Sequence, residues 1–158
     1  MFGLNNYGQC GTGSLEDYYQ PTPFKWAKDT KIVQIAGGIH HTLLLDDAGH
    51  VYSFGRLHYG RLGLGRKEDE EDIKSPQRIP SLEDVETIGA GGACSYALCK
   101  SGEAHAWGMA TNLQLSNGDD EADAWDPIPV KGKQLEDSVL HMIEGGGQHS
   151  VALITRDN

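Results

Sequence analysis

The sequence predicts an all-β protein that is assembled from repeated groups of short strands. Glycine supplies 21 of the 158 residues, about twice its usual ~7% share, and a glycine inside a helix costs roughly 1 kcal/mol relative to alanine. Short runs of β-branched, aromatic and aliphatic residues are bounded by Gly, Asp or Pro, which is typical of strands and turns. Similar segments also recur along the chain, and such self-similarity indicates a repeat architecture.

Two families of segments carry the repeat. The first family comprises FGLNNYGQCGTG from Phe2, FGRLHYGRLGLG from Phe54 and WGMATNLQLSNG from Trp107, at offsets of 52 and 53 residues. The second family comprises GGIHHTLLL from Gly37, GGACSYALC from Gly91 and GGGQHSVAL from Gly145. Between the two families, DDAGHVYSFG and KSGEAHAWG are each expected to form a hairpin, because their central glycine permits positive φ at no steric cost.

The runs between the turn residues predict eight strands. They cover residues 31–36, 39–46, 49–55, 84–90, 93–100, 103–108, 138–144 and 148–154. Several are apolar on both faces, such as Leu43–Leu45, and therefore belong in a sheet that is covered on both sides. The stretches 11–30, 65–80 and 116–129 are expected to be polar connections that contain proline, with a short helix at 14–19 or 68–74.

Repeats of roughly 40–50 residues with several strands each indicate a β-propeller, in which every blade buries both faces against its neighbours. We expect one partial propeller over residues 1–158, with repeat units 2–53, 54–106 and 107–158. Propellers close with about 4–8 blades, whereas three repeats supply about three. Open edges and uncovered apolar faces are therefore expected. The chain is either part of a longer protein or relies on another chain to close its ring.

Charge and composition exclude several partners. The net charge of −10 disfavours direct binding to nucleic acid, because contact with phosphates needs an excess of cations. No apolar stretch approaches the ~18 residues of a membrane span, and no secretion signal is visible. Cys10, Cys94 and Cys99 are expected to be buried free thiols. The acidic runs Glu68–Asp72 and Asp119–Asp123 are either solvated loops or surfaces that steer a basic partner.

The sequence contains no pattern for covalent catalysis, and neither a cofactor nor a metal is expected. HExxH, CxxC and GxSxG do not occur in it. Gly11–Gly13 and Gly63–Gly65 lack the phosphate-loop pattern, so turns are expected at both places. His40 and His41 are neighbours in one strand and therefore point apart, which argues against a metal site that would combine them with Asp46 or Asp47.

The motifs GGxHHT, YSFGRxxYGRLGLG, AWGMxTNxQL, the DAWxP tract, GKQLE and GGQHS follow one another along the chain. In this combination the chain resembles the regulator-of-chromosome-condensation family. The resemblance covers nearly all 158 residues and matches roughly the last three repeats of a seven-bladed propeller. It implies a nuclear, chromatin-associated guanine-nucleotide exchange factor for the small GTPase Ran. In that family, chromatin is bound by earlier segments and nucleotide is displaced by a wedge on an earlier blade, so stand-alone exchange by this chain is not implied.

The sharpest candidate residues follow the Gly-Gly pairs. Counting two residues past each pair places His40, Cys94 and His149 at one equivalent position in successive repeats. Equivalent positions share one propeller surface, so the imidazoles either face a partner or bond a neighbouring blade. The resemblance implies that His40 and His149 face Ran. It adds Arg56 and Asn6, in the loops after the two FG strand ends, although Arg56 could equally form a surface salt bridge.

A second function class stays open, because many proteins with such repeats only bind partners. The alternative is a propeller adaptor or scaffold that does not exchange nucleotide. A plant ultraviolet receptor of the same propeller family is also disfavoured, because its repeats are rich in tryptophan near the GGxH strands. The tryptophans of this chain are Trp26, Trp107 and Trp125, and Trp107 is expected to lie in a blade core.

Overall fold

The computed structural model describes residues 1–26, 29–65, 69–118 and 121–156. The first four-stranded sheet consists of β1 (Ile32–Gly37), β2 (His41–Asp46), β3 (Val51–Gly55) and β4 (Ile73–Arg78). The second consists of β5 (Val85–Ala90), β6 (Cys94–Cys99), β7 (Ala104–Gly108) and β8 (Ala124–Pro129). A two-stranded sheet of β9 (Ser138–Gly145) and β10 (Ser150–Arg156) follows.

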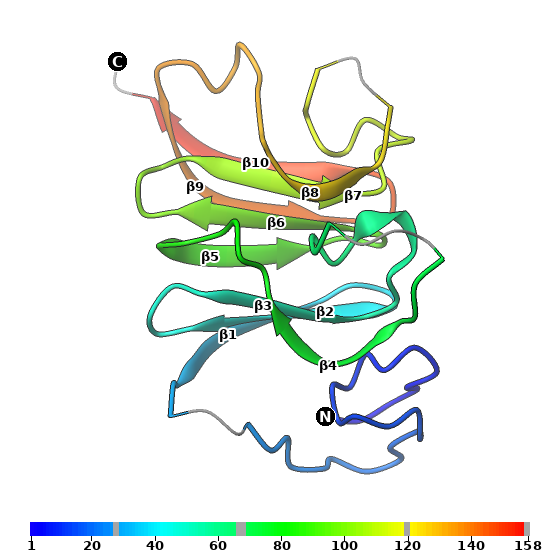
Figure 1. Cartoon of the computed structure of the whole chain (residues 1–158). Helices are drawn as coiled ribbons and strands as arrows, with labels where there is room; N and C mark the ends of the chain where they lie inside the picture. Colours follow the sequence, from blue (N-terminus) through cyan, green and yellow to red (C-terminus); the bar gives the residue numbers. More distant parts are fainter. Residues whose placement is uncertain (27–28, 66–68, 119–120, 157–158) are drawn as a thin grey trace.

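The sheets stack face to face in chain order, as consecutive propeller blades do (Figure 1). Each four-stranded sheet is an antiparallel meander, and the first strands β1, β5 and β9 pack against one another in that order. The N-terminal segment resembles the outer part of a further blade, because Gly3 pairs with Tyr18 as Gly55 at the end of β3 pairs with Ile73 of β4. The predicted all-β partial propeller is therefore confirmed.

All eight predicted strands are present, with bounds shifted by one or two residues. The prediction was wrong for β4 and β8, which lie inside the stretches expected to be connections. Both are outermost in their sheets and contain proline, Pro76 in β4 and Pro127 and Pro129 in β8. Proline cannot donate to a strand ladder, and it is therefore confined to edge strands. Proline, which argued against a strand at these positions, instead indicates the outermost strand of a sheet.

The expected short helix is also wrong. Residues 14–19 are not helical, and 73–74 belong to β4, while residue 68 lies outside the described residues. In the described part of the chain, helical geometry is confined to the 3₁₀ turn η1 (His58–Gly60). No helix among the described residues has the length and apolar character that crossing a membrane requires.

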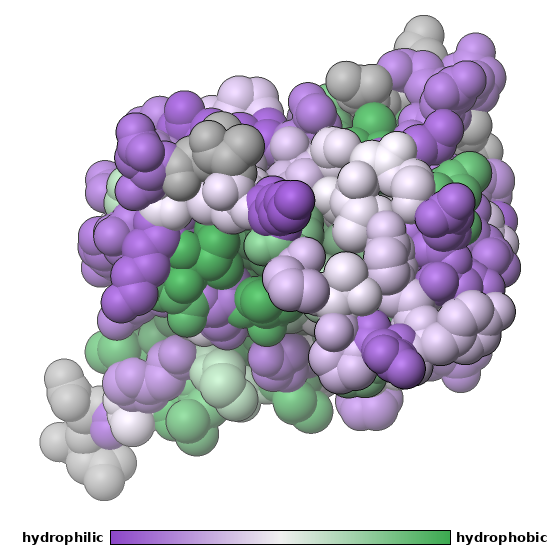
Figure 2. Space-filling model, turned by 90° about the horizontal axis from the view of Figure 1, so that it is seen from below, coloured by the Kyte–Doolittle hydropathy of each residue, from purple (hydrophilic) through white to green (hydrophobic). Residues whose placement is uncertain are grey.

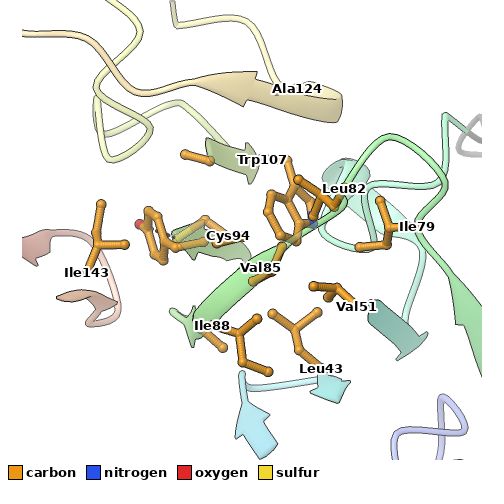
Figure 3. Packing of buried hydrophobic residues seen from close by; sticks show 14 of the residues in the cluster. Leu43, Val51, Ile79, Leu82, Val85, Ile88, Cys94, Trp107, Ala124 and Ile143 are labelled. Carbon is orange, nitrogen blue, oxygen red and sulfur yellow. Dashed lines mark hydrogen bonds between the residues drawn. The ribbon is translucent and has the colours of Figure 1, made fainter. Parts of the chain in front are cut away.

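The main core lies between the two complete sheets. Leu43 and Val51 of the first sheet face Val85 and Ile88 of the second, and Trp107 lies in the same cluster (Figure 3). All six residues of β2 and all six of β6 are buried, as the apolar centre of each strand, such as Leu43–Leu45, predicts. The expected core position of Trp107 is confirmed, and the three cysteines are free and buried.

Apolar faces at the start and end of the stack are uncovered, as expected for an open wedge. Ile35 of β1 pairs with Leu44 as Ile88 of β5 pairs with Ala97, yet Ile35 is 60% exposed and Ile88 only 1%. The difference arises because Ile88 packs on the preceding sheet. Figure 2 shows apolar side chains gathered on the side of the molecule that lies below β1 in Figure 1.

Candidate partner-binding face

Three equivalent loops lie at one end of the sheets. They span residues 3–13, 55–65 and 108–118, and each follows the last residues of a third strand or its equivalent. In each loop two reverse turns come in succession, because the amides of Gly8, Gly60 and Leu113, and then of Gly11, Gly63 and Ser116, donate to carbonyls three residues earlier. The turns expected at Gly11–Gly13 and Gly63–Gly65 are therefore present.

A repeated hydrogen bond ties each loop to the next sheet along the chain. The backbone carbonyl at one loop position accepts from a hydroxyl near the start of that sheet's second strand. The pairs are Thr42 to Gln9 at 2.8 Å, Ser95 to Arg61 at 2.8 Å and Ser150 to Gln114 at 2.7 Å. This recurring contact fixes each loop between two blades, so that side chains on the loops have a rigid support.

Three of the four predicted site residues meet around Tyr7. The ring of Tyr7 contacts the His40 imidazole edge-on, with centroids 4.7 Å apart, and the Arg56 guanidinium lies 4.8 Å from the centroid of the same ring. Asn6 precedes Tyr7 and lines, together with Arg56, a hollow of about 450 Å³. Asn6 is exposed, whereas His40 and Arg56 are half-buried. We call Asn6, Tyr7, His40 and Arg56 the Tyr7 cluster.

His149 is exposed and directly precedes β10, and among the described residues no contact joins it to the Tyr7 cluster. The predicted equivalence of His149 with His40 is wrong. The amides of Gly38, Gly91 and Gly146 donate to the carbonyls of His41, Cys94 and His149, respectively. His149 therefore corresponds to His41. The error came from counting after the second glycine of each pair, whereas the hydrogen bonds place Gly38 in register with Gly91 and Gly146.

His41 has the blade-bridging role that was considered for His40. It is buried, and its Nε2 lies 2.8 Å from the Ser95 hydroxyl, which itself donates to the Arg61 carbonyl. Because that hydroxyl uses its proton on the carbonyl, Nε2 must carry the imidazole proton. Burial, and then the Arg61 guanidinium, lower the pKa of His41 to about 3. His41 is thus a neutral structural residue that links the two sheets.

Positive charge surrounds the His40 imidazole. Burial, then Arg61 and then Arg56, lower the pKa of His40, so this side chain is biased toward the neutral form. Arg61 is only 2% exposed; its Nε donates to the His58 carbonyl at 2.8 Å, and its guanidinium lies 5.5 Å from the centroid of the Tyr59 ring. Both arginines therefore lie over aromatic rings, but Arg56 is half-buried and Arg61 is buried.

The sequence reasoning missed Tyr7. A signal was present in the sequence, because Tyr7 and Tyr59 occupy the same place in FGLNNYG and FGRLHYG. In the structure, each of these tyrosines has an arginine over its ring. In the parts of the chain that the structure describes, no three His, Cys, Asp or Glu side chains are grouped as metal ligands would be.

Comparison with known proteins identifies the repeats. The family model for the regulator of chromosome condensation (RCC1) repeat matches residues 1–45, 48–98 and 101–153. The human "Regulator of chromosome condensation" is 46% identical over 157 residues, which cover 97% of this chain and 36% of that protein. The Drosophila melanogaster protein of the same name is 36% identical, over 98% of this chain and 28% of its own length.

Solved structures agree with the sequence comparison. Prp20p from Saccharomyces cerevisiae superposes with a TM-score of 0.89 at 27% identity, over 99% of this chain and 39% of that one. Human WBSCR16 gives a TM-score of 0.80 at 26% identity, over 96% and 39% of the two chains. The present chain thus spans about a third of the curated relatives that it matches. It belongs to the RCC1 repeat family and forms part of an RCC1-type propeller.

Proposed function

We propose that this chain supplies part of the Ran-binding face of an RCC1-type guanine-nucleotide exchange factor. The observation that carries the proposal is the Tyr7 cluster, in which three residues that the family resemblance implicates come together from two loops and one strand turn. His149, the fourth, lies directly before β10, at the end of the stack opposite the N-terminal segment. Because His149 corresponds to the blade-bridging His41, its contact with Ran rests on the family resemblance alone.

The Arg56 guanidinium supports a role in recognition. Among the described residues no carboxylate forms an ion pair with it, so the surface salt bridge considered for Arg56 does not occupy it there. A guanidinium held over an aromatic ring is oriented in advance, and its planar fork matches a carboxylate. We propose that Arg56 receives an acidic side chain of the GTPase.

Exchange of this kind is binding chemistry rather than covalent catalysis. A factor that binds nucleotide-free GTPase more tightly than the loaded form must weaken nucleotide binding by the same factor. A coupling of about 10⁴ corresponds to about 5.5 kcal/mol, which calls for a large interface. This chain supplies one portion of it, and the wedge that the family uses lies on an earlier blade. Binding to Ran, rather than exchange, is the property expected of the chain alone.

Nuclear localisation and association with chromatin are proposed on the strength of the relatives. The structure report on yeast Prp20p concerns its binding to Gsp1p and histones. For the present chain the proposed chromatin contact is indirect, through the family's earlier segments, because its net charge of −10 does not favour nucleic acid.

The test measures binding of the purified chain to immobilised nucleotide-free Ran, with GDP-loaded Ran as the reference. Arg56→Ala and His40→Ala are each expected to lower affinity about five- to thirty-fold, the equivalent of about 1–2 kcal/mol, with the melting temperature nearly unchanged. Met109→Ala is the matched control, because the Met109 amide donates to Ala93 as the Arg56 amide donates to His40. Equal binding of wild type to both forms of Ran would refute the proposal.

A propeller adaptor remains the second candidate function, and one observation favours it. The same repeats occur in relatives with other names, the "Ultraviolet-B receptor UVR8" of Arabidopsis thaliana at 32% identity and the human "E3 ubiquitin-protein ligase HERC2" at 31%. Selective binding to nucleotide-free Ran supports the exchange-factor role. Capture of a partner whose affinity is independent of nucleotide supports the adaptor.

A further inference from the structure

An acidic side chain holds the backbone next to Arg56. The amide of Leu57 donates to Oδ1 of Asp72 at 2.9 Å, and Leu57 itself is only 2% exposed. The amide of Arg56 donates to the carbonyl of His40 at 2.8 Å. Two successive peptide units are thus fixed, one by the His40 carbonyl directly before β2 and one by the Asp72 carboxylate. The direction in which the Arg56 side chain leaves the backbone depends on both.

The carboxylate contact recurs in the other two loops. Asp17 accepts from the amide of Asn5 at 2.7 Å, and Asp123 accepts from the amide of Ala110 at 3.0 Å. The separations between donor and acceptor are 12, 15 and 13 residues. Because these separations differ, the three aspartates do not align in the sequence repeats, although they take the same place in the fold.

The hydrogen bond from Leu57 also gives a structural role to Asp72, the last residue of the first acidic run. The run was expected to be either a solvated loop or a steering surface. Its last residue, Asp72, is half-buried and lines, with Glu70 and Glu71, the hollow that contains Arg56. The end of the run therefore belongs to the candidate face.

We propose that Asp72 is a positioning residue of this face, and that it acts through the Leu57 amide to hold the Arg56 guanidinium over Tyr7. This role rests on the proposed function. Removing the carboxylate leaves the nearly buried N–H group of Leu57 without its acceptor, so the loop is expected to change its conformation. The Arg56 guanidinium, 4.8 Å from the centroid of the Tyr7 ring, is then no longer attached to a fixed stretch of backbone.

The chain contains a matched control for this role. Asp123 makes the same kind of bond as Asp72, but the loop that it holds carries Met109 and lies outside the Tyr7 cluster. Loss of either carboxylate removes one charge-assisted bond to a backbone amide. A general loss of stability therefore affects Asp72→Ala and Asp123→Ala alike, whereas only the first variant disturbs Arg56.

The experiment compares Asp72→Ala, Asp72→Asn and Asp123→Ala in the purified chain. Affinity for nucleotide-free Ran is expected to fall about tenfold in Asp72→Ala, to stay near wild type in Asp123→Ala, and to recover in Asp72→Asn, because the amide oxygen still accepts from Leu57. Equal losses in Asp72→Asn and Asp72→Ala would overturn the proposal, since they would show that the charge contacts Ran directly. Equal losses in the two alanine variants would also overturn it.

A second readout does not depend on Ran. Protons of the Arg56 side chain lie over the Tyr7 ring and are shifted by its ring current, which NMR measures. Asp72→Ala is expected to move these resonances toward their unstructured positions, whereas Asp123→Ala leaves them in place. Unchanged resonances in Asp72→Ala would refute the positioning role even if binding fell. A wild type that does not bind Ran, together with altered resonances in Asp72→Ala, would refute the proposed function alone.

Discussion

His41 is expected to make the stability of the fold depend on pH. The folded protein keeps this imidazole neutral, because burial and Arg61 lower its pKa from 6.5 to about 3. In the unfolded chain the same group is protonated below about pH 6.5. Between these two values the unfolded state binds more protons than the folded state, so acidification favours unfolding. The contribution of neutral His41 is fully present above pH 6.5 and is lost as the pH falls toward 3.

The magnitude follows from the size of the pKa shift. Each pH unit below 6.5 lowers the free energy of unfolding by about 1.4 kcal/mol, so the step from pH 7 to pH 5 costs about 2 kcal/mol. For a chain of this length, 1 kcal/mol changes the melting temperature by about 2–4 °C. His41 alone is therefore expected to lower the melting temperature by about 4–8 °C over that step. A variant that lacks this imidazole isolates its contribution from the rest of the pH dependence.

Urea unfolding at pH 7 and pH 5 is measured for wild type and for His41→Gln, whose amide can still donate toward Ser95. The variant lacks the titrating group, and its loss of stability over this step is expected to be about 2 kcal/mol smaller. Equal losses in the two proteins would refute the reasoning. If the variant fails to fold, an NMR titration of the wild type decides, because the His41 ring resonances are expected to stay constant down to about pH 4.

Three further predictions concern the packing. Gly55→Ala is expected to lower the melting temperature far more than Gly102→Ala, since both glycines have positive φ but only at Gly55 would a Cβ overlap a neighbouring carbonyl. Gln34→Ala is expected to cost about 1–3 kcal/mol in urea unfolding, because the Gln34 amide bonds both the N–H and the C=O of Ile88 at 2.9 and 2.8 Å; a neutral effect would contradict this. Trp107→Ala is expected to cost about 3–5 kcal/mol, and a loss below 1 kcal/mol would contradict its core position.

The strands that could be predicted are the inner ones. β2 and β6 are buried along their whole length, and their central residues, Leu43–Leu45 and Tyr96–Leu98, are apolar on both faces, which indicates a covered strand. β4 and β8 pair on one side only and tolerate proline and charge, which makes their sequences resemble loops. Proline counted against a strand where it should have indicated an edge. The repeat contained a signal for these two strands, because β4 and β8 each follow a loop of the same type.

The candidate site could be predicted in part. His40, Arg56 and Asn6 were named from loop position and family resemblance, and the structure brings them together around one ring. The equivalence of His149 with His40 failed because the first repeat was counted from Gly37, whereas the backbone hydrogen bonds place Gly38 in register with Gly91 and Gly146. Asp72 could not be found by aligning the repeats, because its distance from Leu57 has no counterpart in the other loops.

The repeat distinguishes residues that hold the backbone of the loops from residues that are free to contact a partner. Hydroxyl donors recur at one position and carboxylate acceptors at another, and each serves the backbone. The loop positions between these contacts differ from repeat to repeat. At the position of Arg56 the other loops carry Leu4 and Met109, and at that of Asn6 they carry His58 and Thr111. A frame that holds all three loops alike leaves selectivity to the positions that differ, so departures from the repeat are the better guide to the binding site.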